Sequence, residues 1–286
     1  MRKLSLLLCL VFPVLLSAQD RIHLTLFGGF ANYQGDLQDR TFTLDESNGA
    51  FGIGVKYDLT SRIAVRSSFN YGSIQGDDKV NNLTLQARNL SFQTKIFELN
   101  LLGEYTFFDL NENRFSPYVF GGIAAFRFNP YAYDSSGNKH FLKPLSTEGQ
   151  GLTAYSDRKP YKLTQFAVPF GAGVKYRITE NAVIGYEIGL RKTFFDYLDD
   201  VSTTYVDPAA LALERGTKAV EMSYRGGEVK NGNPVYPPAG TVRGGSKNKD
   251  WYYFSGITLA VSINAKSWFS GGGRTRKGSN DCPKVL

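Results

Sequence analysis

The sequence predicts an all-β fold. After a cleaved signal peptide, the chain would form an eight-stranded antiparallel transmembrane β-barrel with four long extracellular loops. Three observations predict it. Apolar residues alternate with small or polar ones in eight segments. The connections between these segments are alternately short and long, and aromatic residues collect at both ends of the segments. Composition agrees, because the 286 residues include 21 Phe, 17 Tyr and 30 Gly but only 2 Met, and aromatic residues favour strands.

Residues 1–18 are predicted to be a signal peptide. Arg2 and Lys3 precede an apolar run at 4–16, and small residues follow it. A basic end, a short apolar stretch and a small-residue site are typical of secretory signals. The run is too short to be a membrane-spanning helix, which needs roughly 20 apolar residues. Export and cleavage would leave Cys282 as the only cysteine of the mature chain.

The first four strands follow from apolar residues at every second position, which is the side-chain period of a β-strand. Their apolar faces comprise Ile22, Leu24, Leu26, Gly28 and Phe30; Phe51, Ile53, Val55 and Tyr57; Ile63, Val65, Phe69 and Tyr71; and Phe97, Leu99, Leu101, Tyr105 and Phe107. The opposite faces are small or polar, with Arg66 and Asn70 in the third strand and Glu98 and Glu104 in the fourth. One face suits lipid and the other a polar interior.

The last four strands show the same alternation. Their apolar faces comprise Tyr118, Phe120, Ala124, Phe126 and Phe128; Phe166, Val168, Phe170, Val174 and Tyr176; Ala182, Ile184, Tyr186, Ile188, Leu190 and Phe194; and Trp251, Tyr253, Ile257, Leu259, Val261 and Ile263. Arg127, Lys175, Glu187 and Arg191 fall on the opposite faces. The fifth strand is therefore predicted to turn its aromatic residues to lipid and Arg127 to the lumen.

The lengths of the connections favour a membrane barrel over a soluble β-sandwich. The short connections are 58–62, 109–115 and 179–181, and the long ones are 34–48, 74–90, 129–162 and 196–249. Short periplasmic turns and long extracellular loops characterise outer-membrane barrels. A barrel over 19–264 with a periplasmic N-terminus puts every long loop outside the cell. We therefore expect the chain in the outer membrane, in contact with outer-membrane lipids.

Seven charged residues are predicted to lie in the barrel lumen and to form a charge network there. They are Arg66, Glu98, Glu104, Arg127, Lys175, Glu187 and Arg191. A selectivity filter or a proton path would also use such residues. Eight strands, however, enclose a space that side chains fill. The interpretation we favour is a set of salt bridges in a closed lumen, because an open pore does not fit this strand number.

No catalytic residue or cofactor is expected. The two histidines, His23 and His140, have no recognisable nucleophile partner, and a hydrolase built from His140 with the acids of the fourth long loop is a weaker alternative. Asp196, Asp199, Asp200 and Asp207 are a weak candidate for Ca²⁺, although their spacing is not that of an EF-hand. The alternative is that these acids cap turns and helix ends. Asp207 with Pro208 begins a predicted helix over 209–222.

Residues 265–286 are predicted to be a basic periplasmic tail. Arg274, Arg276, Lys277 and Lys284 lie in it, together with Cys282. Positive charge suits an acidic partner surface or anionic head groups, and an odd cysteine in an exported protein suggests an intermolecular bond or a reactive thiol. These five residues are predicted to contact a periplasmic partner. An exported chain is not expected to bind nucleic acid.

Several segments together resemble the PorG-type outer-membrane β-barrels of the type IX secretion system. They are Gly35-Asp36-Leu37, the 147–151 and 167–171 segments, the run from Arg191 to Asp207, and Asp281-Cys282-Pro283-Lys284. The resemblance covers nearly the whole mature chain, and the run from Arg191 is its most specific part. It implies an accessory of the protein-secretion and gliding-linked machine of Bacteroidota. It also implies a partner, the periplasmic ring lipoprotein complex of the PorK/PorN or GldK/GldN type.

The function predicted from these observations is non-enzymatic. The barrel would anchor or organise the periplasmic ring of a secretion machine. Two alternatives remain open: a surface-binding or adhesion barrel that acts through its extracellular loops, and a hydrolase whose site lies in those loops. Cargo and stoichiometry leave no mark in the sequence.

Overall fold

The computed structural model describes residues 21–38, 46–80, 83–247 and 249–263. The predicted signal peptide and the tail from 265 lie outside these residues, so the five tail positions Arg274, Arg276, Lys277, Cys282 and Lys284 do as well. Eight long strands form the main body. They are β1 (Ile22–Gln34), β2 (Asn48–Asp58), β3 (Ile63–Asp77), β4 (Ser91–Thr106), β5 (Phe115–Arg127), β8 (Thr164–Thr179), β9 (Ala182–Thr193) and β10 (Trp251–Ser262).

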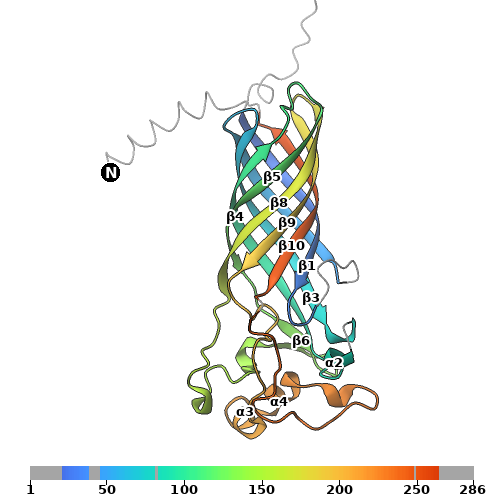
Figure 1. The fold of residues 1–286 in the computed structure, drawn as a ribbon, viewed down its shortest axis with the longest axis vertical. Coiled ribbons are helices and arrows are strands. Elements are labelled where there is room, and N and C mark those ends of the chain that lie inside the picture. Colours follow the sequence, from blue (N-terminus) through green and yellow to red (C-terminus); the bar gives the residue numbers. More distant parts are fainter. Residues whose placement is uncertain (1–20, 39–45, 81–82, 248, 264–286) are drawn as a thin grey trace, which may run out of the picture.

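The eight strands close into an antiparallel barrel (Figure 1). Each strand pairs with the next along the chain, and β1 pairs with β10 from His23 opposite Ser262 to Gln34 opposite Trp251, which completes the ring. Closure leaves no strand edge unpaired, as a membrane-spanning sheet requires. The predicted eight-stranded barrel is thereby confirmed. No helix in the described part of the chain is long and apolar enough to cross a membrane.

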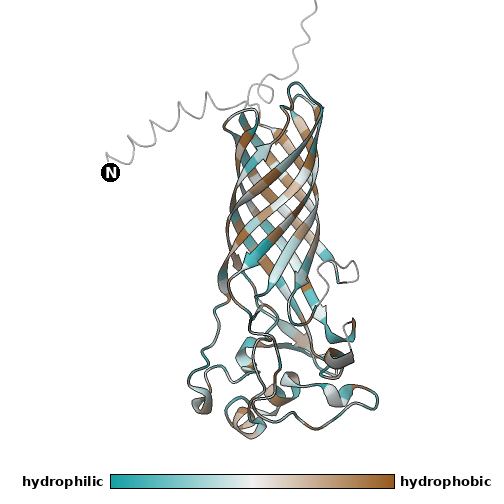
Figure 2. Cartoon of the chain, in the orientation of Figure 1, coloured by the Kyte–Doolittle hydropathy of each residue, from teal (hydrophilic) through white to brown (hydrophobic). Residues whose placement is uncertain are grey.

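Side chains alternate between the two faces of the barrel wall, and apolar residues recur along the strands (Figure 2). In β4, Leu99 is 60% exposed while its neighbour Glu98 is fully buried. Exposed apolar positions of this kind occur on every long strand, which is the pattern of a wall that faces lipid. The predicted facing holds for β4 and is reversed in β5.

In β5 the aromatic residues point inward, so the predicted facing of this strand is wrong. Tyr118, Phe120 and Phe126 are buried, while Ile123 is 65% exposed and Arg127 lies on the outer face. The cause is packing: glycines on β8 and β9 leave inward space that these rings fill. A Cβ on Gly171 would come within 2.7 Å of the Phe120 ring.

The connections differ in size at the two ends of the barrel. Short turns join strands at one end, and at the other the third and fourth long connections fold over the barrel (Figure 1). We call residues 128–163 and 194–250 the loop cap. Its elements are β6 (Tyr131–Tyr133), β7 (Lys139–Phe141), the 3₁₀ turns η3 (Lys143–Leu145), η4 (Thr153–Tyr155) and η5 (Gly226–Glu228), and the helices α3 (Pro208–Arg215) and α4 (Thr217–Ser223). The second long connection holds η2 (Asp78–Val80) and α2 (Leu83–Gln86).

The predicted helix over 209–222 is two helices. Asp207 caps α3 by accepting a hydrogen bond from the amide of Ala210, as its position before Pro208 suggested. Gly216, with a φ of 84°, ends α3 and begins α4, because residues other than glycine rarely adopt that backbone conformation. A buried cluster of Leu152, Val206, Leu211 and Ala219 joins these helices to the third loop.

Candidate functional site

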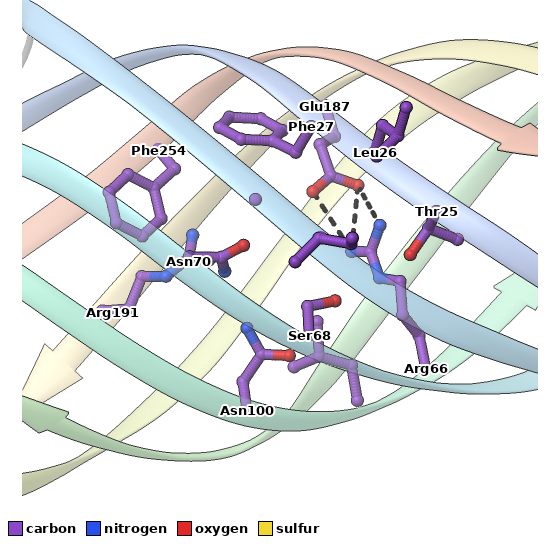
Figure 3. Close-up of a pocket in the computed structure, with 13 residues that line it drawn as sticks. Thr25, Leu26, Phe27, Arg66, Ser68, Asn70, Asn100, Glu187, Arg191 and Phe254 are labelled. Carbon is purple, nitrogen blue, oxygen red and sulfur yellow. Dashed lines mark hydrogen bonds and ion pairs between the residues drawn. The ribbon is translucent and has the colours of Figure 1, made fainter.

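The lumen holds a charge network centred on Arg66 of β3. Its guanidinium lies 3.0 Å from Glu187 of β9 and 3.0 Å from Glu104 of β4. The Nζ of Lys175, on β8, lies 2.6 Å from the other oxygen of Glu104. The hydroxyl of Tyr118 donates to Glu187. Figure 3 shows Arg66 and Glu187 facing each other across the barrel interior.

A second group of lumenal contacts surrounds Glu98 of β4. The guanidinium of Arg191 lies 3.0 Å from its carboxylate. The amides of Asn70 and Asn100 and the hydroxyl of Tyr252 donate to the same carboxylate at 2.8–2.9 Å. A fully buried carboxylate that accepts this many hydrogen bonds is stable only with its partners in place. Glu98 therefore fixes strands on both sides of the lumen.

The structure brings together six of the seven residues predicted for the lumen. Arg127 is the exception, because it is exposed on the outside of β5. Its position follows from the inward packing of Phe126, which forces the next side chain outward. The six remaining residues are three cations and three carboxylates, and each cation touches at least one carboxylate.

The middle of the lumen has room for one water molecule. The cavity beside Arg66, Glu187, Asn100 and Phe254 has a volume of about 10 Å³, which is about the least that a single water needs. The side chain oxygen of Asn100 has no hydrogen-bond partner there, so a water fits its chemistry. The middle of the lumen therefore holds paired charges and little free volume.

The loop cap is held together by Glu148, which is fully buried in the third loop. Its carboxylate accepts hydrogen bonds from the amides of Ser202 and Thr203, both at 2.9 Å, and from the hydroxyl of Thr203 at 2.6 Å. Arg243 donates to it at 3.0 Å. All of these donors belong to the fourth loop, so this one side chain clamps the two loops together. Gly149, at a φ of 78°, allows the tight turn that aims Glu148 inward.

Arg243 extends this clamp to the rest of the cap. Its guanidinium also donates to the backbone oxygens of Asp200, at 2.8 Å, and Ser223, at 3.0 Å. Arg88, from the second loop, donates to the backbone oxygen of Arg243 and lies 2.7 Å from Asp78. Three of the long loops therefore share one buried hydrogen-bonded network.

The four acids proposed for Ca²⁺ do not converge on one point. Asp196 accepts from Ser202, Asp199 accepts from the hydroxyl of Tyr33, and Asp207 caps α3. Asp200 accepts from the hydroxyls of Thr147, at 2.5 Å, and Tyr161, at 2.7 Å. No group of three or more metal-ligating side chains with metal-binding geometry occurs in the described part of the chain. The geometry fits the alternative, in which the acids cap turns and backbone amides.

Several carboxyl groups in the cap and in the neighbouring first long connection are partly or fully buried. Burial raises the pKa of Asp36 to about 6, and the charge of Asp196 acts in the same direction. Burial likewise raises the pKa of Asp200 to about 6, despite the opposing effect of Arg243. Burial raises the pKa of Asp250 as well, and the nearby charge of Asp199 adds to this shift. Each of these carboxyl groups therefore binds its proton more tightly than it would in an unfolded segment.

Neither histidine contacts a hydroxyl or thiol within the described residues. His23 lies 2.6 Å from Asp58, at the end of the barrel where the short turns join the strands. His140 lies 2.9 Å from Asp134, which also pairs with Lys218. A histidine and an acid are present in each case, but the nucleophile that a hydrolase needs is not among their partners.

The residues that organise the cap were largely missed by the sequence interpretation. Glu148 lies in the 147–151 segment, which is one of those that carry the family resemblance. That membership was the one feature of the sequence that pointed to a role for this residue. Arg88, Arg243 and Asp250 stand in polar loops and have no pattern around them. Their partners are 10 to 217 residues away in the chain, so spacing alone could not find them.

The fold defines a class: an outer-membrane β-barrel with paired charges in its lumen and a hydrogen-bonded loop cap at one end. A family model described as a domain of unknown function (DUF6089) matches residues 1–214, so the chain belongs to that family. A search of curated proteins found no match.

Solved structures similar to this chain include outer-membrane barrels from three bacterial sources. Neisserial surface protein A aligns at 10% identity with a TM-score of 0.41, over 84% of this chain and 96% of its own. The outer membrane protein OprG from Pseudomonas aeruginosa aligns at 14% identity with a TM-score of 0.40, over 85% of this chain and 97% of its own. Ail, the attachment invasion locus protein of Yersinia pestis, was solved in complex with a heparin analogue. It aligns at 9% identity with a TM-score of 0.38, over 84% of this chain and 97% of its own. Values this low carry no information about what this chain binds.

Proposed function

We propose that this chain is a non-enzymatic structural barrel that anchors or organises the periplasmic part of a type IX protein-secretion machine. The observation that carries the proposal is the filled lumen. Arg66, Lys175 and Arg191 are each paired with a carboxylate inside the barrel, and the cavity at the middle of the lumen has room for one water. A barrel whose centre is filled in this way suits a scaffold better than a pore for protein.

The family resemblance supplies the identity of the machine in this proposal. Its most specific segment, from Arg191 to Asp207, starts in the lumenal network and continues into the centre of the loop cap. Arg191 pairs with Glu98, and Ser202 and Thr203 bind Glu148. The residues that carry the resemblance thus have structural roles in this fold, which supports kinship with a barrel of the same construction.

The periplasmic end is the expected contact surface for the ring lipoprotein complex. A cavity of about 290 Å³ opens there, and five Lys or Arg residues against two acids line it, including Arg21, Arg62 and Arg177. The tail residues Arg274, Arg276, Lys277, Cys282 and Lys284 would add positive charge beside this opening. An acidic periplasmic partner matches both features.

The experiment that tests the proposal is truncation after Phe269 in the native host. The full chain should co-purify with the periplasmic ring proteins, and the truncated chain should recover clearly less of them. Heat-modifiable migration on gels shows that both barrels are folded. Equal recovery from the two proteins would refute tail docking. Normal secretion after deletion of the whole gene would refute the role in secretion.

The ordered cap favours a second candidate, a barrel that binds a surface partner through its outer loops. The cap has its own buried core, and Glu148 with Arg243 fixes it as one unit. A rigid loop surface loses little conformational entropy on binding. Deletion that abolishes surface binding but leaves secretion intact would select this candidate over the first.

A further inference from the structure

A groove of about 300 Å³ lies on the outside of the barrel, at the extracellular ends of β4 and β5 and beside the β6–β7 hairpin. Its lining combines two kinds of side chain. Lys95, Arg127 and Lys139 bring positive charge, and Phe97, Tyr131 and Phe141 bring aromatic surface. Nothing in the charge network of the lumen or the cap involves these residues.

The three cations have no carboxylate partner within the described residues. Lys95 and Arg127 are exposed and form no ion pair there, in contrast to the paired cations of the lumen. The Nζ of Lys139 lies 3.5 Å from the centre of the Tyr131 ring and 4.9 Å from that of Phe141. These cation–π contacts hold the ammonium in the groove but leave its charge uncompensated.

The groove lies at the height of the outer lipid head groups. Along the outer face of β4, Tyr105, Leu101, Leu99 and Phe97 are all exposed and apolar, and Lys95 is the next outward position. Ten residues separate Tyr105 from Lys95, which at a rise of ~3.3 Å and a tilt of ~40° span about 25 Å of membrane. That is the height of the apolar band of such barrels, so Lys95 lies at its outer rim.

On β5 the same change occurs between Ile123 and Arg127. Ile123 is 65% exposed and pairs with Leu101, whereas Arg127 pairs with Phe97. Two neighbouring strands therefore pass from apolar to cationic at one level. Aromatic rings at that level are typical of the membrane interface. A ligand that spans the boundary, with acyl chains below and an anionic head above, matches this arrangement.

We propose that the groove binds a phosphate-bearing glycolipid of the outer leaflet, of the lipid A class. Arg127 and Lys95 contact its phosphate, because guanidinium and ammonium groups form charge-assisted hydrogen bonds to phosphate oxygens. Tyr131 and Phe141 pack against the sugar, and Phe97 packs against the first carbons of an acyl chain. The corrected facing of β5 is essential here, since Arg127 would otherwise lie in the lumen.

The same phosphate chemistry occurs in phospholipids and in free phosphate, and the test separates these sources. The full chain in detergent is titrated with bisphosphorylated lipid A, with lipid A from which the phosphates have been removed, with phosphatidylglycerol and with inorganic phosphate. Bound lipid is counted by native mass spectrometry. Bisphosphorylated lipid A should bind at least tenfold more tightly than each of the others, since each lost charged contact costs about tenfold.

The variant that tests the site is Lys95→Gln with Arg127→Gln. Affinity for bisphosphorylated lipid A should fall about a hundredfold, at roughly tenfold for each charge removed. Lys192→Gln is the matched control. Lys192 lies on β9, away from the groove, and its Nζ is likewise near an aromatic ring, 5.8 Å from the centre of the Trp251 ring. The control should bind as the unchanged chain does, and heat-modifiable migration verifies that both variants fold.

Three results would overturn the proposal. Equal affinity of the double variant and the unchanged chain would exclude the groove as the site. Equal binding of phosphatidylglycerol or inorganic phosphate would exclude an outer-leaflet glycolipid as its ligand. Equal binding of lipid A without phosphates would exclude charge recognition.

Discussion

Glu148→Ala should open the loop cap while it leaves the barrel intact. The carboxylate of Glu148 is fully buried and accepts four hydrogen bonds from Ser202, Thr203 and Arg243. Its removal leaves the amides of Ser202 and Thr203 without their acceptor and the buried guanidinium of Arg243 without its carboxylate. No other carboxylate is within salt-bridge distance of Arg243 among the described residues, so no partner is at hand to replace it.

Removal of one member of a buried ion pair typically costs 3–5 kcal/mol, roughly the loss expected here for cap closure. The amides of Ser202 and Thr203 report this loss directly, because both donate to Glu148. Hydrogen exchange of a peptide that covers both amides should accelerate by roughly 10² to 4 × 10³, since 1.4 kcal/mol is a factor of ten. A peptide from the middle of β4 should exchange as slowly as before.

Glu214→Ala is the matched control. Glu214 is a carboxylate of the same cap, but among the described residues it accepts a single hydrogen bond from the third loop, from the amide of Thr153 at 2.9 Å. Its removal should cost about 1 kcal/mol or less, so exchange at Ser202 and Thr203 should change by less than tenfold. If the two variants gave the same exchange rate at these amides, the clamp role of Glu148 would be refuted.

Three further predictions concern facing, pH and the lumen. Leu99→Arg and Ile123→Arg, both on the lipid side, should each lower the free energy of unfolding by roughly 2–4 kcal/mol, as followed by urea titration of gel migration. A small effect at Ile123 would contradict the corrected facing of β5. The raised pKa of Asp200, about 6 against an ordinary 3.8, gives the folded cap a contribution to its stability that is full below pH 4 and is lost as pH rises through 6. Cap exchange corrected for intrinsic rates should therefore be faster at pH 8 than at pH 5, and Asp200→Asn should reduce that difference. Glu187→Ala removes a carboxylate that accepts from Arg66 and Tyr118, and should lower the urea midpoint for barrel unfolding, whereas an unchanged midpoint would show that the network contributes no stability.

The number of strands and the membrane class could be predicted because they depend on local patterns. Alternation at period two, turn lengths and the count of apolar faces are all readable along the chain. The facing of β5 could not be read in this way. Its inward residues Tyr118, Phe120 and Phe126 are aromatic, and aromatic residues suit both a filled lumen and a lipid surface. Only the glycines opposite them, on β8 and β9, decide between the two, and that register is a property of the closed barrel.

The candidate sites also divide into features that local sequence patterns predict and features that only the folded structure reveals. The lumenal ion pairs were predictable as a group, because charged residues on the face opposite to lipid must meet inside a narrow barrel. The clamp between Glu148 and Arg243 joins residues 95 positions apart in two irregular loops. Irregular loops carry no periodicity, so nothing in the sequence fixes which polar residues are buried. The unpaired cations Lys95 and Arg127 became visible as a pair only once the pairing of β4 with β5 was known.

The cap is also tied to the barrel wall, which bears on how the molecule acts as a whole. The hydroxyl of Tyr33, on β1, donates to Asp199, and the hydroxyl of Thr193, on β9, donates to the backbone oxygen of Asp250. Asp250 in turn accepts from the amide of Leu198 at 2.8 Å. The fourth loop is therefore anchored at two strands on the barrel rim, and Glu148 anchors it to the third loop. The lumen beneath is lined by paired charges that join strands across the barrel. The hydrogen-bonded loop cap is therefore fixed to a barrel wall that is itself cross-linked from within.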